Sequence, residues 1–364
     1  MKLELDILPL KTWLPNYNGP LIIAGPCGAE SREQMLNTAK GIEKINKALV
    51  FRAGIWKPRT RPNAFEGVGA EGLDWLKEVK QETGLLTTVE VANAQHVELA
   101  LKAGVDILWI GARTTVSPFA VQEIASALTG VDIPVMVKNP IHPEIKLWAG
   151  ALERINQAGI KKLIAVHRGF YSYEKTMYRN SPNWSIPIEL KIMCKELPVI
   201  CDPSHICGRT DILLSVMQKA LDLNMDGLMI ETHIKPKEAL SDAEQQVTPD
   251  QLGNLLGELI QRNANSNNPE FENQLHELRT EIDTIDIELL QALANRMAVV
   301  EKIGEYKKDN QVTILQLERW YEILNTRTHK GEIMGLNTEF IKGLLELVHK
   351  ESIRVQTKVM NMKS

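Results

Sequence analysis

The segment VICDPSHICGRT, residues 199–210, places two cysteines and a histidine within seven positions. Zinc-binding cysteines usually occur in pairs two to four residues apart, often with a second pair or a histidine pair nearby. Here five residues separate Cys201 from Cys207, and His205 has no neighbouring histidine. The local spacing therefore does not decide whether the cluster binds a metal, and further ligands would have to come from elsewhere in the chain.

The elements that would position such residues are short apolar runs, which recur at intervals of 20 to 30 residues. They lie at 21–25, 50–54, 85–90, 107–112, 133–138, 162–167, 197–202 and 227–232. Amphipathic stretches with helical spacing and serine caps separate them. Eight continuous apolar strands alternating with helices indicate a parallel sheet that is covered on both faces. Over roughly 250 residues we predict a (β/α)₈ TIM barrel, with a doubly wound open sheet as the alternative.

Ionisable side chains stand at the end of almost every predicted strand, where barrels build their active sites. Any one of them could be a core residue or a solvated loop charge, but their recurrence at all strand ends indicates a site. In chain order they are Cys27, Arg52, Lys57, Arg59, Glu90, Arg113, Lys138, Arg168, His205 and Glu231, with Asp242 in the loop after the last strand.

Four of these residues form a mixed set of one sulfur, one nitrogen and two oxygen ligands. They are Cys27, His205, Glu231 and Asp242. Such a set suits one divalent transition metal, Mn, Fe, Co or Zn, and the thiolate argues against Mg or Ca. We therefore predict that His205 binds the metal with distant Cys27, that Cys201 packs in the core, and that Cys207 lies in a loop without coordinating.

The remaining strand-end residues are six cations that converge on one mouth. They are Arg52, Lys57, Arg59, Arg113, Lys138 and Arg168. Such a collection is tolerated only around anions, most plausibly phosphates and carboxylates.

The motifs GPCGAE, RAGIWKPRTRP, GART, VKNP, HRG, DPSH and ETH, followed by LSDAEQQ, occur in this order between residues 20 and 260. Together they closely resemble the type I beta group of 3-deoxy-D-arabino-heptulosonate 7-phosphate (DAHP) synthases. The resemblance implies condensation of phosphoenolpyruvate with erythrose 4-phosphate, the entry step of the shikimate pathway, with a metal that polarises the aldehyde. Many relatives read GPCSVE where this chain reads GPCGAE, a change that leaves the ligand sulfur in place.

The resemblance also assigns roles to individual residues. Lys57 would donate a proton to the forming alkoxide, and Arg59 with Thr60 would hold the aldose phosphate. Phosphoenolpyruvate would be held by Arg52, Lys57, Arg113, Lys138 and Arg168. The related synthase that makes an eight-carbon sugar acid phosphate from arabinose 5-phosphate is the alternative, but it carries KANRS where this chain has KPRT.

After residue 262 the character of the chain changes. The polar, Asn-rich segment 263–271 reads as a linker between a barrel domain, 1–262, and a helical domain, 272–364. Helical spacing predicts helices at about 271–308, 314–328 and 338–359. The first would be about 57 Å long and could not bury its length against two short helices, so we predict a homodimer formed by this three-helix domain.

Spacing alone favours an ordinary dimerisation bundle, but residues 272–357 also resemble the all-helical chorismate mutase. That family converts chorismate to prephenate. The resemblance implies that Arg279 and Arg296 grip the carboxylates, that Lys307 and Gln356 bind the ether oxygen, and that Ser352 contacts a carboxylate. Arg319 would orient the others.

Two features qualify the mutase prediction. Gln316 and Trp320 stand where the family usually has acidic residues, so the domain could instead be a sensor of chorismate or prephenate. Arg279 and Lys307 are also 28 residues apart, about 42 Å on one helix, so a shared site needs Arg279 from a neighbouring chain.

Composition limits the remaining possibilities. The 364 residues hold 42 basic and 46 acidic side chains, which gives no sign of a nucleic-acid surface. Four cysteines do not make a disulfide framework, and no apolar run reaches the 18 residues of a membrane span. We predict a soluble, cytoplasmic, bifunctional enzyme in which prephenate, rather than chorismate, inhibits the barrel.

Overall fold

The computed structural model describes residues 2–15, 17–57, 64–262 and 265–362. The chain divides into two compact units, Met1–Ala264 and Asn265–Ser364. Among the described residues, no helix is both long and apolar enough to cross a membrane.

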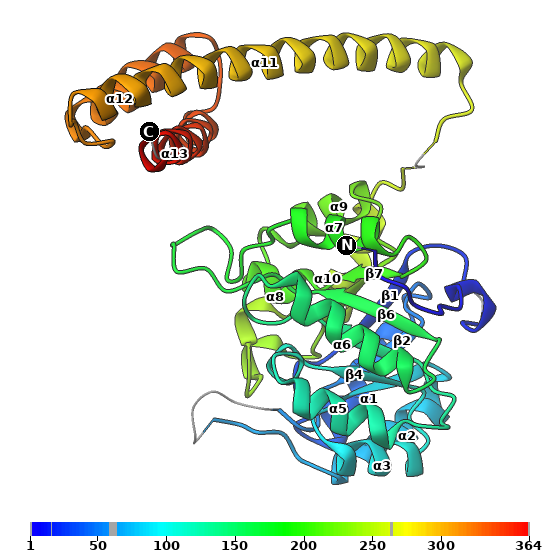
Figure 1. Ribbon diagram of the computed structural model, residues 1–364. Coiled ribbons are helices and arrows are strands. Elements are labelled where there is room, and N and C mark those ends of the chain that lie inside the picture. Colours follow the sequence, from blue (N-terminus) through cyan, green and yellow to red (C-terminus); the bar gives the residue numbers. More distant parts are fainter. Residues whose placement is uncertain (1, 16, 58–63, 263–264, 363–364) are drawn as a thin grey trace. The chain divides into compact units, whose positions relative to one another are not determined.

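The first unit is a closed barrel of eight parallel strands, in which each strand pairs with the next and β8 pairs with β1 (Figure 1). The predicted TIM barrel is thus confirmed. The strands are β1 (Leu21–Gly25), β2 (Val50–Ala53), β3 (Leu86–Val91), β4 (Ile107–Ile110), β5 (Val135–Lys138), β6 (Leu163–His167), β7 (Val199–Cys201) and β8 (Gly227–Glu231). They are apolar on both faces because one face fills the barrel and the other packs against helices.

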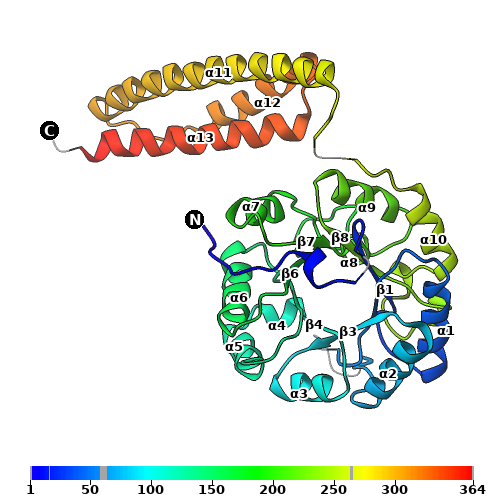
Figure 2. The same cartoon turned by 90° about the vertical axis from the view of Figure 1, so that its right-hand side faces the viewer.

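Helices form a ring around the barrel (Figure 2). They are α1 (Arg32–Glu43), α2 (Glu71–Thr83), α3 (Ala94–Lys102), α4 (Ala112–Thr115), α5 (Pro118–Ala127), α6 (Ile145–Gln157), α7 (Ser185–Met193), α8 (Pro203–Cys207), α9 (Leu213–Asp222) and α10 (Pro249–Glu258), with 3₁₀ turns η1 (Leu10–Thr12), η2 (Pro236–Glu238) and η3 (Ala243–Gln245). Side chains of Ser31, Asn93, Ser117 and Thr248 cap α1, α3, α5 and α10. These caps satisfy amide groups that would otherwise lack partners.

The barrel interior is a separate apolar cluster, distinct from the layer between strands and helices. It contains Ile23, Trp109, Met136 and Ile200, and Leu10 of the N-terminal segment belongs to it. Trp109 lies at the end of this cluster nearest the carboxyl ends of the strands, since its ring lies 5.1 Å from the Arg52 guanidinium carbon and 5.8 Å from Lys138 Nζ.

Our prediction for Cys207 was wrong in its location. Cys207 is the last residue of α8 and is buried, because Asp202 caps a short helix immediately after β7 instead of opening a loop. Cys201 lies in β7 and is fully buried, as a core residue should be.

The second unit consists of α11 (Pro269–Asp309), α12 (Leu317–Ile333) and α13 (Thr338–Asn361). The second helix extends five residues beyond the predicted end at 328. Gly331 lies inside this helix. A Cβ there would lie 2.4 Å from Ile341 Cδ1, so the glycine lets α13 approach closely. The helix stops just before Gly335, whose φ of +81° favours glycine.

Helix α11 carries a row of apolar side chains that this unit leaves half exposed. Leu278, Ile282, Ile285 and Leu289 are 58, 56, 54 and 49% exposed. Dimerisation through this face remains a prediction.

Candidate active sites

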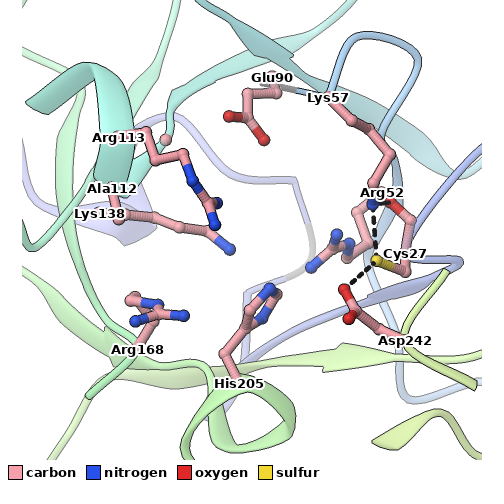
Figure 3. A pocket seen from close by; sticks show the side chains of 11 residues that line it. Cys27, Arg52, Lys57, Glu90, Ala112, Arg113, Lys138, Arg168, His205 and Asp242 are labelled. Carbon is pink, nitrogen blue, oxygen red and sulfur yellow. Dashed lines mark hydrogen bonds between the residues drawn. The ribbon is translucent and has the colours of Figure 1, made fainter. Parts of the chain in front are cut away.

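The strand-end residues gather around one cavity at the carboxyl ends of the barrel strands (Figure 3). Its lining residues are Cys27, Arg52, Lys57, Glu90, Gly111, Ala112, Arg113, Lys138, Arg168, His205 and Asp242. Arg59 and Thr60 lie outside the described residues. Eight separate strand–helix units thus supply one polar site.

Three of the four predicted metal ligands meet directly. Ligand atoms of Cys27, Glu231 and Asp242 all lie within 4.8 Å of one another. His205 adjoins them, with Nε2 3.7 Å from Oε1 of Glu231. In the described part of the chain, this buried oxygen of Glu231 makes no hydrogen bond. Its nearest cation is Arg52, with Nη2 at 3.1 Å. One sulfur, one imidazole nitrogen and two carboxylates in this arrangement fit a divalent transition metal.

Cys27 has neighbours of both charges. Its Sγ donates to Asp242 Oδ2 at 3.1 Å and accepts from Lys57 Nζ at 2.6 Å. Burial, together with the nearby Glu231, raises the pKa of the Cys27 thiol to about 12. The residue is therefore a neutral thiol in the metal-free protein, and metal binding would displace its proton.

Asp202, which the sequence analysis did not single out, orients His205. Its Oδ1 accepts from the His205 backbone amide at 3.1 Å, and its Oδ2 lies 2.8 Å from His205 Nδ1 and 2.6 Å from Lys138 Nζ. Burial would raise the pKa of Asp202, but His205 and Lys138 outweigh it and hold that pKa well below its usual range. The carboxylate leaves Nε2 as the free nitrogen of His205, as second-sphere partners of metal-binding histidines do.

The cations surround the other side of the cavity. Arg52 is 2% exposed, and its Nη2 lies 3.1 Å from Glu231 Oε1. Its Nε and Nη1 are buried and have no hydrogen-bond partner among the described residues. Arg168 donates to Asn180 Oδ1 at 2.8 Å, and burial lowers its pKa to about 10, which still leaves it charged at neutral pH. Buried donors without acceptors in a cationic mouth indicate an anion site.

Glu90 is a carboxylate that lines the cavity on its cationic side, and its Oε2 accepts from Trp109 Nε1 at 3.1 Å. A Cβ on Gly111 would lie 2.0 Å from Glu90 Oε1, so only glycine leaves room for this carboxylate. Glu90 therefore both fixes Trp109 and offsets part of the positive charge.

Arg179 and Gln245, which residue spacing did not indicate, contact the carboxylates of the predicted metal ligands. Burial would raise the pKa of Asp242, yet Arg179 and His205 hold it well below its usual range. Arg179 lies in the long loop between β6 and α7, where nothing in residue spacing distinguishes it from a solvated charge.

In the helical unit, α11 and α13 bring three predicted residues together. Arg296 Nη1 donates to Ser352 Oγ at 2.7 Å. Gln356 is buried one turn further along, and its Oε1 has no hydrogen-bond partner in the part of the unit that the structure describes. Gly304 faces this part of α13, where a Cβ would lie 3.3 Å from the Val359 Cβ, a tight contact that glycine avoids. These residues form a polar cluster that includes a buried group without a hydrogen-bond partner among the described residues.

The other predicted mutase residues are arranged differently. Lys307 Nζ donates to the Ile314 carbonyl at 2.6 Å, Arg319 pairs with Glu322, and Arg279 is exposed. Trp320 stacks on His349 with ring centroids 3.8 Å apart. Within one chain the unit therefore assembles only part of the predicted site.

Comparison with known families divides the chain in the same way. Residues 16–266 match the DAHP synthetase I family, and residues 278–357 match chorismate mutase type II. The chain is 30% identical over 238 residues to a phospho-2-dehydro-3-deoxyheptonate aldolase of Thermotoga maritima, covering 65% of this chain and 68% of that protein. It is 28% identical over 265 residues to a 2-dehydro-3-deoxyphosphooctonate aldolase of Wolinella succinogenes, covering 66% of this chain and 98% of that protein.

Solved structures show the same likeness. The crystal structure of the Thermotoga maritima DAHP synthase aligns with a TM-score of 0.61 at 28% identity, over 70% of this chain and 75% of that one. A truncated form of the enzyme from the same organism aligns with a TM-score of 0.57 at 28% identity, over 65% and 84%.

Proposed function

The chain belongs to the DAHP synthetase I family, and from that premise we propose that its barrel condenses phosphoenolpyruvate with erythrose 4-phosphate to DAHP and phosphate. The observation that carries the proposal is Arg52, a buried guanidinium inside a ring of cations, whose Nε and Nη1 have no acceptor in the part of the barrel that the structure describes. Phosphoenolpyruvate carries a phosphate and a carboxylate, the two groups that such donors bind. Arg113, Lys138 and Arg168 complete the set around it.

Cys27, His205, Glu231 and Asp242 would hold the metal. Bound there, a divalent transition metal supplies Lewis acidity toward the aldehyde oxygen of the sugar phosphate. C3 of phosphoenolpyruvate forms the new bond to the aldehyde carbon, and Lys57 donates its proton to the aldehyde oxygen. Water then adds at C2 and phosphate leaves, while the cations stabilise the departing charge.

Binding of phosphoenolpyruvate tests the role of Arg52 directly. Arg52→Met keeps an apolar stem but removes both free donors, so affinity measured by calorimetry should fall on the order of 10²-fold. Arg209 is a matched control because it forms an exposed pair with Asp211. If Arg52→Met and the Arg209→Met control both bound phosphoenolpyruvate with unchanged affinity, Arg52 would not be part of the binding site.

The aldose phosphate is the substrate that distinguishes a DAHP synthase from the related octulosonate synthase. The family resemblance rests on KPRT at residues 57–60 for erythrose 4-phosphate, whereas the relative from Wolinella succinogenes is an octulosonate aldolase. We favour erythrose 4-phosphate, and parallel assays with arabinose 5-phosphate distinguish the two substrates.

For the helical unit we propose chorismate mutase activity in a homodimer. Arg296, Ser352 and Gln356 form the polar cluster described above. Catalysis would come from holding chorismate in a reactive geometry and stabilising charge on its ether oxygen. Arg279 and Lys307 lie on the same helix, 28 residues or about 42 Å apart, so the partner chain would supply Arg279.

A second candidate is a sensor of chorismate or prephenate with little turnover. It is favoured by Trp320, which replaces an expected acid and is occupied by stacking on His349. An assay for loss of chorismate separates them, because turnover excludes the sensor and binding without turnover supports it. In either case we propose that prephenate bound to this unit inhibits the barrel.

We also propose that the protein is cytoplasmic, because a reducing compartment suits its four free cysteines.

A further inference from the structure

Arg179 contacts the proposed metal site from the long loop between β6 and α7. Its Nη1 donates to Asp242 Oδ1 at 2.9 Å and to Gln245 Oε1 at 2.6 Å. The side chain is 47% exposed, so it reaches the site from solvent instead of filling the core.

Gln245 continues the contact inward. It is 1% exposed, and its Nε2 donates to Glu231 Oε2 at 2.6 Å. A single chain of hydrogen bonds thus runs from Arg179 to both carboxylates of the metal site, directly to Asp242 and through Gln245 to Glu231.

The two carboxylates are engaged in the same way. In each, one oxygen is occupied by this network, Oδ1 of Asp242 and Oε2 of Glu231. The other oxygens lie toward the remaining ligands: Asp242 Oδ2 accepts from Cys27 Sγ at 3.1 Å, and Glu231 Oε1 lies 3.7 Å from His205 Nε2 and 3.1 Å from Arg52 Nη2. The network therefore leaves one oxygen of each carboxylate for a metal.

The loop that carries Arg179 is itself attached to the helix of His205. The backbone amides of Arg179 and Asn180 donate to the Cys207 and Ile206 carbonyls at 3.3 and 3.2 Å, and Asn180 Nδ2 donates to the His205 carbonyl at 2.6 Å. Gly208 leaves the space for Arg179, because a Cβ there would lie 2.5 Å from the Arg179 Cβ.

Asp242 needs such an external hold. Its backbone is left-handed, with φ 52° and ψ 39°, a conformation that residues other than glycine adopt uncommonly, although aspartate adopts it more readily than most. Among the described residues, no strand pairs with the chain at Asp242, whereas Glu231 ends β8 and is paired with Gly25 of β1.

We propose that Arg179 and Gln245 are positioning residues that fix Asp242 and Glu231 with one oxygen of each directed at the metal. The inference rests on the proposed metal centre and adds to it two residues that touch neither metal nor substrate. Partners of metal ligands typically change metal affinity 10- to 100-fold when removed.

Titration of metal-depleted protein with Co²⁺ against a competing chelator tests the proposal, with the thiolate-to-cobalt absorption band reporting Cys27. Arg179→Met and Gln245→Leu should each weaken Co²⁺ binding about 10- to 100-fold. The double variant should lose less than the product of the two, because both act through one network. Arg179→Lys, which retains the charge, should lie between Arg179→Met and the unsubstituted protein.

Arg209→Met is the matched control, since it removes an arginine whose partner, Asp211, is exposed. Thermal unfolding of the metal-free variants separates misfolding from misplacement. If Gln245→Leu lowers the Tm, the result for Arg179→Met decides between the two explanations. The Arg179 side chain is half exposed, so its replacement leaves no buried cavity. Unchanged Co²⁺ affinity in Arg179→Met overturns the inference, whereas absence of Co²⁺ binding in the unsubstituted protein overturns the metal centre itself.

Discussion

Replacing Asp202 with asparagine tests whether one buried carboxylate supports both halves of the barrel site. Asp202 is fully buried, with Oδ2 2.6 Å from Lys138 Nζ and 2.8 Å from His205 Nδ1, and Lys138 is only 5% exposed. Asparagine keeps the size and the cap on α8 but removes the charge. Lys138 would then be a buried ammonium without its counterion.

Breaking a buried ion pair by removing one partner costs about 3–5 kcal/mol. The lower end corresponds to a decrease in Tm of about 6–12 °C for a domain near this size. Calorimetric unfolding of the barrel transition measures the decrease. Asp211→Asn, in an exposed pair with Arg209, is the matched control and should change stability by less than about 1 kcal/mol.

The pH dependence gives a second check. Because the pKa of Asp202 is depressed in the fold, its contribution is fully present above the unfolded pKa, near 3.9, and is lost as pH falls through the folded value. Asp202→Asn should therefore be less stable than the unsubstituted protein at neutral pH, with the difference shrinking only below about pH 4. Equal stability of the two proteins at pH 7 would refute the role of Asp202 as the shared counterion.

Other predictions follow from the two sites. Alanine in place of Cys27 or His205 should abolish metal binding and condensation while the barrel stays folded, whereas Cys207→Ala should retain both; metal content by elemental analysis decides, and the opposite pattern would contradict the ligand assignment. Prephenate should slow condensation in the intact chain but not in a chain that ends before the helical unit, and equal inhibition of both would locate the inhibitory site in the barrel. Arg279→Ala and Lys307→Ala chains, each inactive alone, should regain mutase activity when they are dissociated, mixed in equal amounts and reassembled, because about a quarter of all sites would then be intact. No recovery in confirmed heterodimers would exclude a shared site.

The fold was predictable because its signal is repeated. Eight apolar runs with ionisable ends occur in one order that a closed parallel barrel explains, and the structure confirms the barrel. Helix ends were less predictable: Gly331 resembles a stop signal, yet it lies inside α12 at a close contact with Ile341. Only tertiary structure reveals that this glycine is a contact and not a terminus.

The site was predictable where residues end strands and not where they support those residues. Cys27 and Glu231 follow from position alone. Asp202 carried a weak signal, as the first residue after β7 and before a helix, whereas Arg179 carried none, because its contacts with Asp242 depend on how a long loop folds back. The same limit explains Cys207, whose burial follows from the short helix that Asp202 caps.

The most direct test of the barrel's proposed chemistry is phosphate release from phosphoenolpyruvate by the metal-loaded full-length protein. We predict release with erythrose 4-phosphate, little with arabinose 5-phosphate, and loss of activity on chelation that Mn²⁺, Co²⁺ or Zn²⁺ restores. Release that requires arabinose 5-phosphate, or that persists unchanged after verified removal of all metal, would contradict the account.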